Sequence, residues 1–264
     1  GDYFSKRRAL AQVYGQFNDS SAKALFRLAL KDTMASIRIY ALNRLKEQKK
    51  GREEWQQQVA SLSVFDGNNK VRAAAFDVLG AWRVSGSAAD MTFALDDSSY
   101  HVAGAALAAL YALQPDTAYA QALRLWQTAP RGRLQQEIWT ILGKHGKDAD
   151  VLLFAQDARG LGGARKIQLG DGLTALLKRT QDDGLFSKGL SILEEMTLTE
   201  NISGYRRGLG GLVFELGKSY NARTKSDKGA EVRLQQISAS AARMTDSEKD
   251  PGVKKQFEEW RKAW

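Results

Sequence analysis

The apolar positions of this chain recur at helical spacing, and the spacing itself repeats. Counted from Asp32, an Ile stands at offset five, an Arg at offset six, an Ala at offset nine and a Leu at offset thirteen. The pattern recurs with Val at offset five from Asp66, a third copy with Ala in place of Arg starts at Asp97, and a weaker fourth starts at Ala129. Offsets five, nine and thirteen share one helix face, so each copy predicts a helix with a buried stripe. A period of roughly 32 residues is typical of a helix-turn-helix unit.

Capping residues and helix breakers extend the prediction to the whole chain. Asp250 followed by Pro251, for example, predicts a helix start with Asp as the cap and Pro at the first helical position. The helices predicted in the first half span residues 2–15, 20–31, 34–48, 51–63, 69–81, 87–95, 98–113, 116–127 and 131–144. Those predicted in the second half are longer and less even, and span residues 148–158, 163–180, 183–196, 203–220, 226–244 and 250–263. We therefore expect an all-α fold, an α-α superhelix of antiparallel helix pairs. Its repeats look like the HEAT type over residues 2–160, and residues 161–264 continue the same array irregularly.

Asp and Arg occupy fixed offsets in successive copies. An Asp just before a helix is expected to cap it, because its carboxylate accepts hydrogen bonds from the first-turn amides. An Arg six residues later is expected to reach the Asp of its own or the adjacent copy. Stacked copies then form a ladder, to which we assign a structural role and no catalytic one. Its members are Asp32, Arg38, Asp66, Arg72 and Asp97.

Composition narrows the class of protein. The chain has 264 residues, of which 43% are hydrophobic and 26% charged, and no apolar run approaches the roughly 18 residues of a membrane span. This predicts a soluble globular protein. Because cysteine is absent, a disulfide scaffold, a thiolate metal site and a cysteine nucleophile are excluded, while the compartment stays open. The net charge of +9 would favour an acidic partner if it were gathered on one face, but the basic residues are dispersed.

Residues that could carry catalysis or hold a metal are scarce. His101 and His145 lie far apart, and neither belongs to an H-E-x-x-H helix, in which two histidines on one face hold a zinc ion. Glu194 and Glu195 are adjacent, so on a helix they diverge by about 100° and cannot act together as acid and base. We expect no catalytic, cofactor-binding or metal site in this chain.

Two further patterns favour packing over chemistry. The glycines at 160–163 and 208–211 stand beside arginines, but neither segment completes a phosphate-binding loop, so they predict turns or close helix packing. The tryptophans lie at helical spacing among apolar residues and are predicted to anchor the core, not to stack on nucleic-acid bases. They are Trp55, Trp82, Trp126, Trp139, Trp260 and Trp264.

The opening stretch resembles a known family. Residues 3–10, Tyr-Phe-Ser-Lys-Arg-Arg-Ala-Leu, precede the segment Leu28–Asp32 and the pairs Ile37-Arg38 and Ala41-Leu42. This order is similar to the start of the C-terminal HEAT-like helical domain of bacterial gluzincin aminopeptidases, the aminopeptidase N-like zinc enzymes. The match covers mainly residues 2–80, and any HEAT array shares about half of its motifs.

The resemblance implies an upstream thermolysin-like domain that carries H-E-x-x-H and a Gly-x-Met-Glu-Asn motif for the free N-terminus of a peptide. Neither motif occurs in this chain, so no catalytic or zinc-binding residue is carried over, and zinc is expected only in the parent's catalytic domain. Because the chain starts at Gly1 without Met, we expect an excised C-terminal part with a residue left by tag removal. Its implied partner is its own upstream catalytic domain, which it would cover as a helical bowl that shapes the peptide chamber.

A peptide substrate is expected at the concave face, formed by the helices over 34–48, 69–81 and 98–113, where a long side chain such as Arg44 could reach it. Two other functions stay open. A stand-alone HEAT-repeat scaffold would bind a protein partner along the same face, since solenoids offer extended surfaces and need no chemistry. Nucleic-acid binding through phosphate neutralisation is a third function, disfavoured by the dispersed charge.

Overall fold

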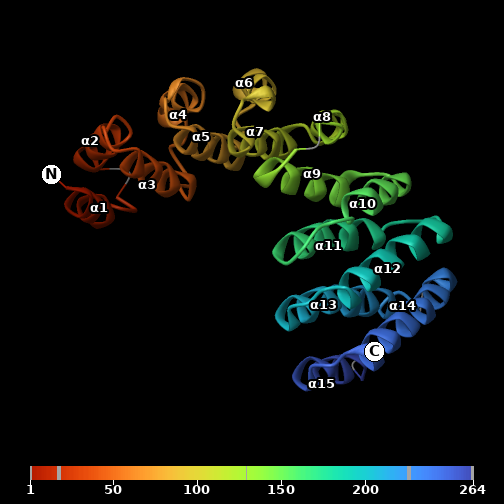
Figure 1. The fold of residues 1–264 in the computed structure, drawn as a ribbon. Coiled ribbons are helices and arrows are strands. Elements are labelled where there is room, and N and C mark those ends of the chain that lie inside the picture. The colour runs from red at the N-terminus through yellow and green to blue at the C-terminus, as the bar shows by residue number, and fades with distance from the viewer. Residues whose placement is uncertain (1, 17–18, 129, 225–226, 263–264) are drawn as a thin grey trace. The chain divides into compact units, whose positions relative to one another are not determined.

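The computed structural model describes residues 2–16, 19–128, 130–224 and 227–262, and every regular element in these ranges is helical (Figure 1). The predicted all-α fold class is therefore confirmed. The α-helices are α1 (Tyr3–Gln12), α2 (Ser20–Ala29), α3 (Ala35–Lys46), α4 (Glu53–Phe65), α5 (Asn69–Trp82), α6 (Ala88–Phe93), α7 (Tyr100–Leu113), α8 (Pro115–Trp126), α9 (Gly132–His145), α10 (Val151–Asp157), α11 (Ala164–Leu177), α12 (Asp183–Leu198), α13 (Ser203–Asn221), α14 (Lys228–Ser247) and α15 (Pro251–Arg261). Short 3-10 helices span Ser85–Ser87, Ala94–Asp96 and Asp148–Asp150. No helix in the described ranges has both the length and the apolar character to cross a membrane.

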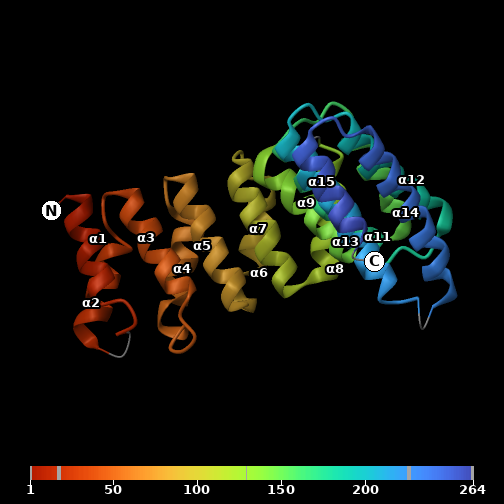
Figure 2. The same cartoon turned by 90° about the horizontal axis from the view of Figure 1, so that it is seen from below.

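The chain divides into two compact units, residues 1–138 and 139–264. In the first unit α1, α3, α5 and α7 pack side by side as one layer, and α2, α4, α6 and α8 cover them as a second (Figure 1). In the second unit α11, α13 and α15 form one layer and α10, α12 and α14 the other (Figure 1). Figure 2, the view from below, shows α1, α3, α5 and α7 following one another across the first unit. Each unit is thus a two-layered array of helix pairs. The finer assignment to HEAT-type repeats, and the change in regularity expected near residue 160, stay predictions.

The repeated offsets form the core of the first unit. The apolar residues at offsets five, nine and thirteen are buried in α3, α5 and α7, as their spacing predicts. They are Ile37, Ala41, Leu45, Val71, Ala75, Leu79, Val102, Ala106 and Leu110. The fourth copy starts at Ala129, which lies outside the described residues, but its Leu134, Ile138 and Leu142 are buried in α9.

The ladder aspartates do not cap these helices, which corrects the sequence prediction. The N-cap positions are Met34, Asn68 and Ser99, two residues after each Asp. Each Asp carboxylate instead accepts a hydrogen bond from the backbone N–H of that N-cap residue, at 2.9, 2.9 and 2.8 Å. The physical reason is that each helix begins three residues after its Asp and not directly after it, so the Asp forms an Asx turn before the helix and does not cap it. Asp250 does cap α15, through the amides of Gly252 and Val253, as predicted.

Glycine lets neighbouring helices approach closely. A Cβ at Gly80 of α5 would lie 2.7 Å from the Cα of Ala109 in α7, and one at Gly172 of α11 would lie 2.6 Å from the Trp139 carbonyl oxygen. The predicted roles of the two glycine segments are confirmed. Gly160 adopts a positive φ of 76° in a turn, and a Cβ at Gly210 would lie 2.3 Å from the Phe257 ring. Both segments therefore serve chain geometry.

The tryptophans mostly anchor the core, as predicted. Trp55, Trp82 and Trp139 are buried, while Trp126 and Trp260 are half-buried. The indole N–H of Trp139 donates to a carboxylate oxygen of Asp157 at 2.6 Å, and this bond ties α9 to the end of α10. Trp264 lies outside the described residues.

Candidate functional site

The structure brings the ladder residues together in pairs. Arg38 donates to both carboxylate oxygens of Asp66, at 2.7 and 2.8 Å, and to the carbonyl of Asp32 in its own copy at 2.6 Å. Arg72 repeats this geometry, with the carboxylate of Asp97 at 2.9 Å and the carbonyl of Asp66 at 3.0 Å. Each Arg therefore joins its own loop to the loop of the next copy.

The same device recurs in the second unit, where the sequence prediction did not find it. Arg206 donates to the carbonyl of Glu200 at 3.1 Å and to the carboxylate of Glu248 at 2.9 Å. The acid is Glu in place of Asp and the copies are farther apart, but the spacing from Glu200 to Arg206 is the same offset six. That spacing was a usable signal. In the copy that starts at Asp97, offset six is occupied by Ala103 and not by Arg, so the run of arginines ends at Arg72.

The residues weighed as catalytic candidates do not form a common site. The described ranges hold no group of three or more His, Cys, Asp or Glu that could bind a metal ion. Burial, with help from the Arg133 charge, lowers the pKa of His101, and His145 has a partner of its own. Glu194 pairs with Arg243 at 2.6 Å, whereas Glu195 faces a different space, so the two carboxylates diverge as predicted.

Arg44, the side chain expected to reach a peptide, takes part in an aromatic cluster. Its guanidinium lies 4.8 Å from the ring centre of Tyr14 and 5.1 Å from that of Tyr40, and 3.6 Å from the Glu47 carboxylate. These contacts hold the Arg44 side chain near the C-terminal end of α3. Its proposed contact with a peptide stays a prediction.

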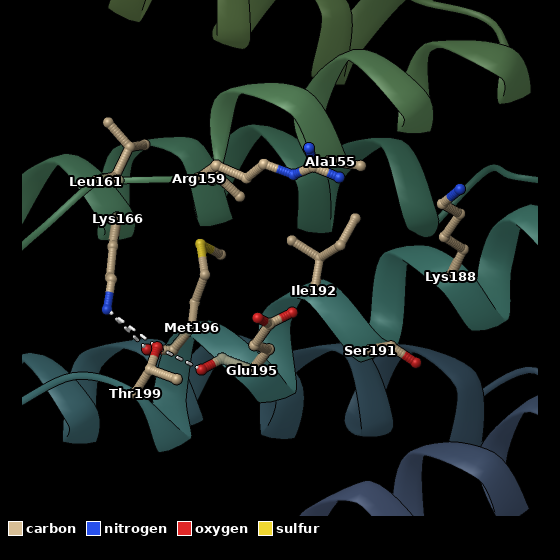
Figure 3. Close-up of a pocket in the computed structure, with 12 residues that line it drawn as sticks. Ala155, Arg159, Leu161, Lys166, Lys188, Ser191, Ile192, Glu195, Met196 and Thr199 are labelled. Atoms are coloured by element: carbon tan, nitrogen blue, oxygen red, sulfur yellow. Dashed lines mark hydrogen bonds between the residues drawn. The ribbon is translucent and has the colours of Figure 1, made fainter.

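A cleft lies between α10 and α12 in the second unit. Its volume is about 610 Å³, within the range of roughly 300–1,000 Å³ that is usual for ligand sites. Ile192 and Met196 of α12 form an apolar floor, and Arg159 and Glu195 extend into the same space (Figure 3). The full lining is Ala155, Ala158, Arg159, Gly160, Leu161, Lys166, Lys188, Ser191, Ile192, Glu195, Met196 and Thr199.

The cleft exists because two neighbouring helices differ in length. α10 has 7 residues and α12 has 16, so α10 covers only part of the α12 surface. After α10 the chain turns away through Gly160 and Gly163, both with positive φ, and re-enters as α11. Ile192 and Met196 of α12, which are 9% and 3% exposed, lie at the bottom of the cleft.

Lys166 closes one end of the cleft and is fully engaged. Its ammonium lies 3.3 Å from the Glu200 carboxylate and donates to the Thr199 hydroxyl at 3.3 Å and the Met196 carbonyl at 3.4 Å (Figure 3). Burial raises the pKa of Glu200, but the amides of Ile202 and Gly163 together with Lys166 outweigh burial and lower it. This end of the cleft is therefore a closed, charge-balanced wall.

The other charged groups of the cleft are available to a ligand. Arg159, Lys188 and Glu195 are exposed, and no hydrogen bond or ion pair joins their side-chain charges to other described residues. The hydroxyls of Ser191 and Thr199 donate to backbone carbonyls within their own helix, so neither is held by a base as a nucleophile requires. The cleft thus combines an apolar floor with two cations and one carboxylate, a set of groups that can bind a ligand of mixed polarity.

Comparisons with known proteins leave the family of the chain open. No protein-family model matches it, and no curated protein matches it. Among solved structures, the chain is similar to the crystal structure of Legionella pneumophila aminopeptidase A in complex with aspartic acid, with a TM-score of 0.38 and 11% sequence identity. The similarity covers 98% of this chain and 36% of that one, so the chain spans about a third of that protein. The resemblance noted for residues 2–80 stays a prediction.

Proposed function

We propose that this chain is a non-catalytic helical-repeat domain that binds a polypeptide segment in the α10–α12 cleft. The main support is that Arg159, Lys188 and Glu195 surround an apolar floor and that their charged groups form no hydrogen bond or ion pair with other described residues. The ladder arginines, in contrast, donate their hydrogen bonds to acceptors in the loops and are not available to a ligand. Arrays of helix pairs commonly bind partners through such extended surfaces and need no reactive groups.

The chemistry of the cleft favours an acidic segment with apolar side chains. An apolar side chain of the ligand would contact Ile192 and Met196, and its carboxylates would pair with Arg159 and Lys188. The single acid, Glu195, lies on α12 between Lys188 and Thr199 and would disfavour a ligand carboxylate placed beside it. This charge pattern gives specificity more than affinity.

Fluorescence anisotropy with the full chain tests this proposal. The probe is a labelled peptide of sequence Gly-Glu-Asp-Leu-Leu-Glu-Asp-Gly, and the competitor carries Lys at the four acidic positions. Arg159→Glu combined with Lys188→Glu should weaken binding at least about tenfold, because both charges are reversed at exposed positions that do not support the core. The matched control, Lys255→Glu with Lys262→Glu on exposed positions of the same unit, should bind as the original chain does. Equal affinity of the two double variants would contradict the proposal.

The finer proposal is that the chain is the C-terminal helical domain of a zinc aminopeptidase, in which it covers the catalytic domain and shapes the peptide chamber. Its support is the motif resemblance over residues 2–80. In that case zinc belongs to the upstream domain and this chain supplies no ligand to it. The reading frame on the N-terminal side of Asp2 should then encode both H-E-x-x-H and Gly-x-Met-Glu-Asn. A frame without H-E-x-x-H rejects the finer proposal, and the cleft then supports a stand-alone interaction scaffold.

A further inference from the structure

Two phenylalanines of the first unit are exposed to solvent at equivalent ends of neighbouring helices. Phe65 is the last residue of α4 and is 81% exposed, and Phe93 is the last residue of α6 and is 82% exposed. Phe4, near the N-terminus, is also exposed, at 77%. The other described phenylalanines are at most 2% exposed: Phe26, Phe76, Phe154, Phe186, Phe214 and Phe257. Aromatic rings left in water in this way are common at interaction sites.

Phe93 borders a hollow, the α4–α6 groove, with Val64 on its other side and the ring of Phe76 within its lining. The groove lies between the end of α4, which has 13 residues, and α6, which has only 6. Its volume is about 160 Å³. That is well below the usual size of a small-molecule site, so the groove is suited to a single apolar side chain.

The rim of the groove is acidic. Asp90, Asp96 and Asp97 line it together with one cation, Arg72, whose guanidinium is already held by Asp97. The Asp90 carboxylate has no hydrogen bond or ion pair with other described residues, and the Asp96 carboxylate pairs with Arg124 at 3.1 Å in an exposed bridge. Because the whole chain carries a net charge of +9, this rim is a local exception that attracts basic groups.

We infer that the α4–α6 groove is a docking site for a partner polypeptide segment in which one apolar side chain is flanked by Lys or Arg. The apolar side chain enters between Val64 and Phe93, above the buried Phe76, and the basic side chains pair with Asp90 and Asp96. This surface belongs to a different unit from the α10–α12 cleft and has the opposite charge preference. The inference therefore stands independently of the proposed function.

Anisotropy of the full chain with a labelled peptide of sequence Gly-Lys-Arg-Leu-Leu-Arg-Lys-Gly tests the inference. Phe93→Ser and Asp90→Lys should each weaken binding at least about tenfold, since they remove the apolar wall and reverse a rim charge. The control Phe4→Ser removes an equally exposed ring outside the groove and should leave the affinity within about twofold of the original.

Circular dichroism of each variant checks that the helices are intact, which the exposure of Phe93 leads us to expect. Binding of the basic peptide that is equal in the Phe93→Ser and Phe4→Ser variants would overturn the inference, as would no binding by the original chain. The Arg159→Glu, Lys188→Glu chain should still bind the basic peptide. If this double variant lost binding of the basic peptide, the two sites would not be separate. The proposed function is tested with the acidic peptide only.

Discussion

At the scale of single residues, the ladder depends on the shape of the guanidinium group. Arg38 uses one nitrogen for the carbonyl of its own loop and two for the carboxylate of Asp66 in the next, which the fork of five N–H donors permits. Lys166 takes a similar place beside Glu200 but makes longer contacts of 3.3 and 3.4 Å. An ammonium group is a point charge and cannot match two acceptors in a plane.

Arg38→Leu should lower the free energy of unfolding by about 2–3 kcal/mol, because it leaves the Asp66 carboxylate, whose side chain is 6% exposed, without its cation. Arg124→Leu breaks an exposed pair with Asp96 in the same unit and should cost less than about 1 kcal/mol. Urea unfolding of both variants measures the difference. Equal, small losses would show that the ladder does not join the copies.

The ladder of the second unit should make stability depend on pH. Burial disfavours the charged form of Glu248, but Arg206 and the backbone amide of Asp250 outweigh it and lower its pKa below the ordinary 4.5. A carboxyl whose pKa is lower in the folded than in the unfolded chain stabilises the fold above that ordinary value, and this contribution is lost as the pH falls below it. Glu248→Gln should therefore be less stable than the original at pH 7, and the gap should shrink towards pH 3 in urea titrations. A gap that is constant with pH would contradict this linkage.

At the scale of elements, helical periodicity was enough to place the helices. Local packing determined their exact lengths and continuity, which periodicity could not predict. The expected helix over 203–220 is continuous as α13 although Gly208 and Gly210 weakened it, because both lie where Ile167 and Phe257 leave no room for a Cβ. The expected helix over 87–95 is shorter, since its last residues form a 3-10 turn at Ala94–Asp96. Such differences in length depend on tertiary contacts and leave little trace in a single sequence.

The α10–α12 cleft could not be predicted for the same reason. Its lining comes from α10, the turn after it, α11 and α12, and no motif links these segments. The feature that opens it is the end of α10 at Asp157, where Trp139 of α9 holds the carboxylate. The Glu200 to Arg206 spacing, by contrast, was present in the sequence and was hidden only by the exchange of Asp for Glu.

Close helix approach gives a prediction at this scale. Gly172→Ala should lower the free energy of unfolding by about 1–3 kcal/mol, because the new methyl group meets a backbone carbonyl of α9 that cannot move aside. Gly204→Ala lies in α13 of the same unit with open space around it, and should gain about 0.5 kcal/mol from helix propensity. Chemical denaturation separates the two, and a gain in both variants would contradict the packing of α9 on α11.

At the scale of the whole molecule, the net charge of +9 describes neither candidate surface. The α10–α12 cleft presents two free cations, and the α4–α6 groove presents an acidic rim. The two surfaces lie in different units and differ in charge preference, and each lies beside a short helix, α6 or α10. In both proposals the partner is therefore placed next to a short helix.

Hydrogen–deuterium exchange of the full chain with the acidic peptide, followed by mass measurement of the peptide, tests whether the α10–α12 cleft binds a polypeptide segment without cleaving it. We expect slower exchange in residues 155–161 and 188–199 and a peptide of unchanged mass, with or without added zinc. Unchanged exchange in both segments, or a peptide cleaved by the purified chain, would contradict this expectation.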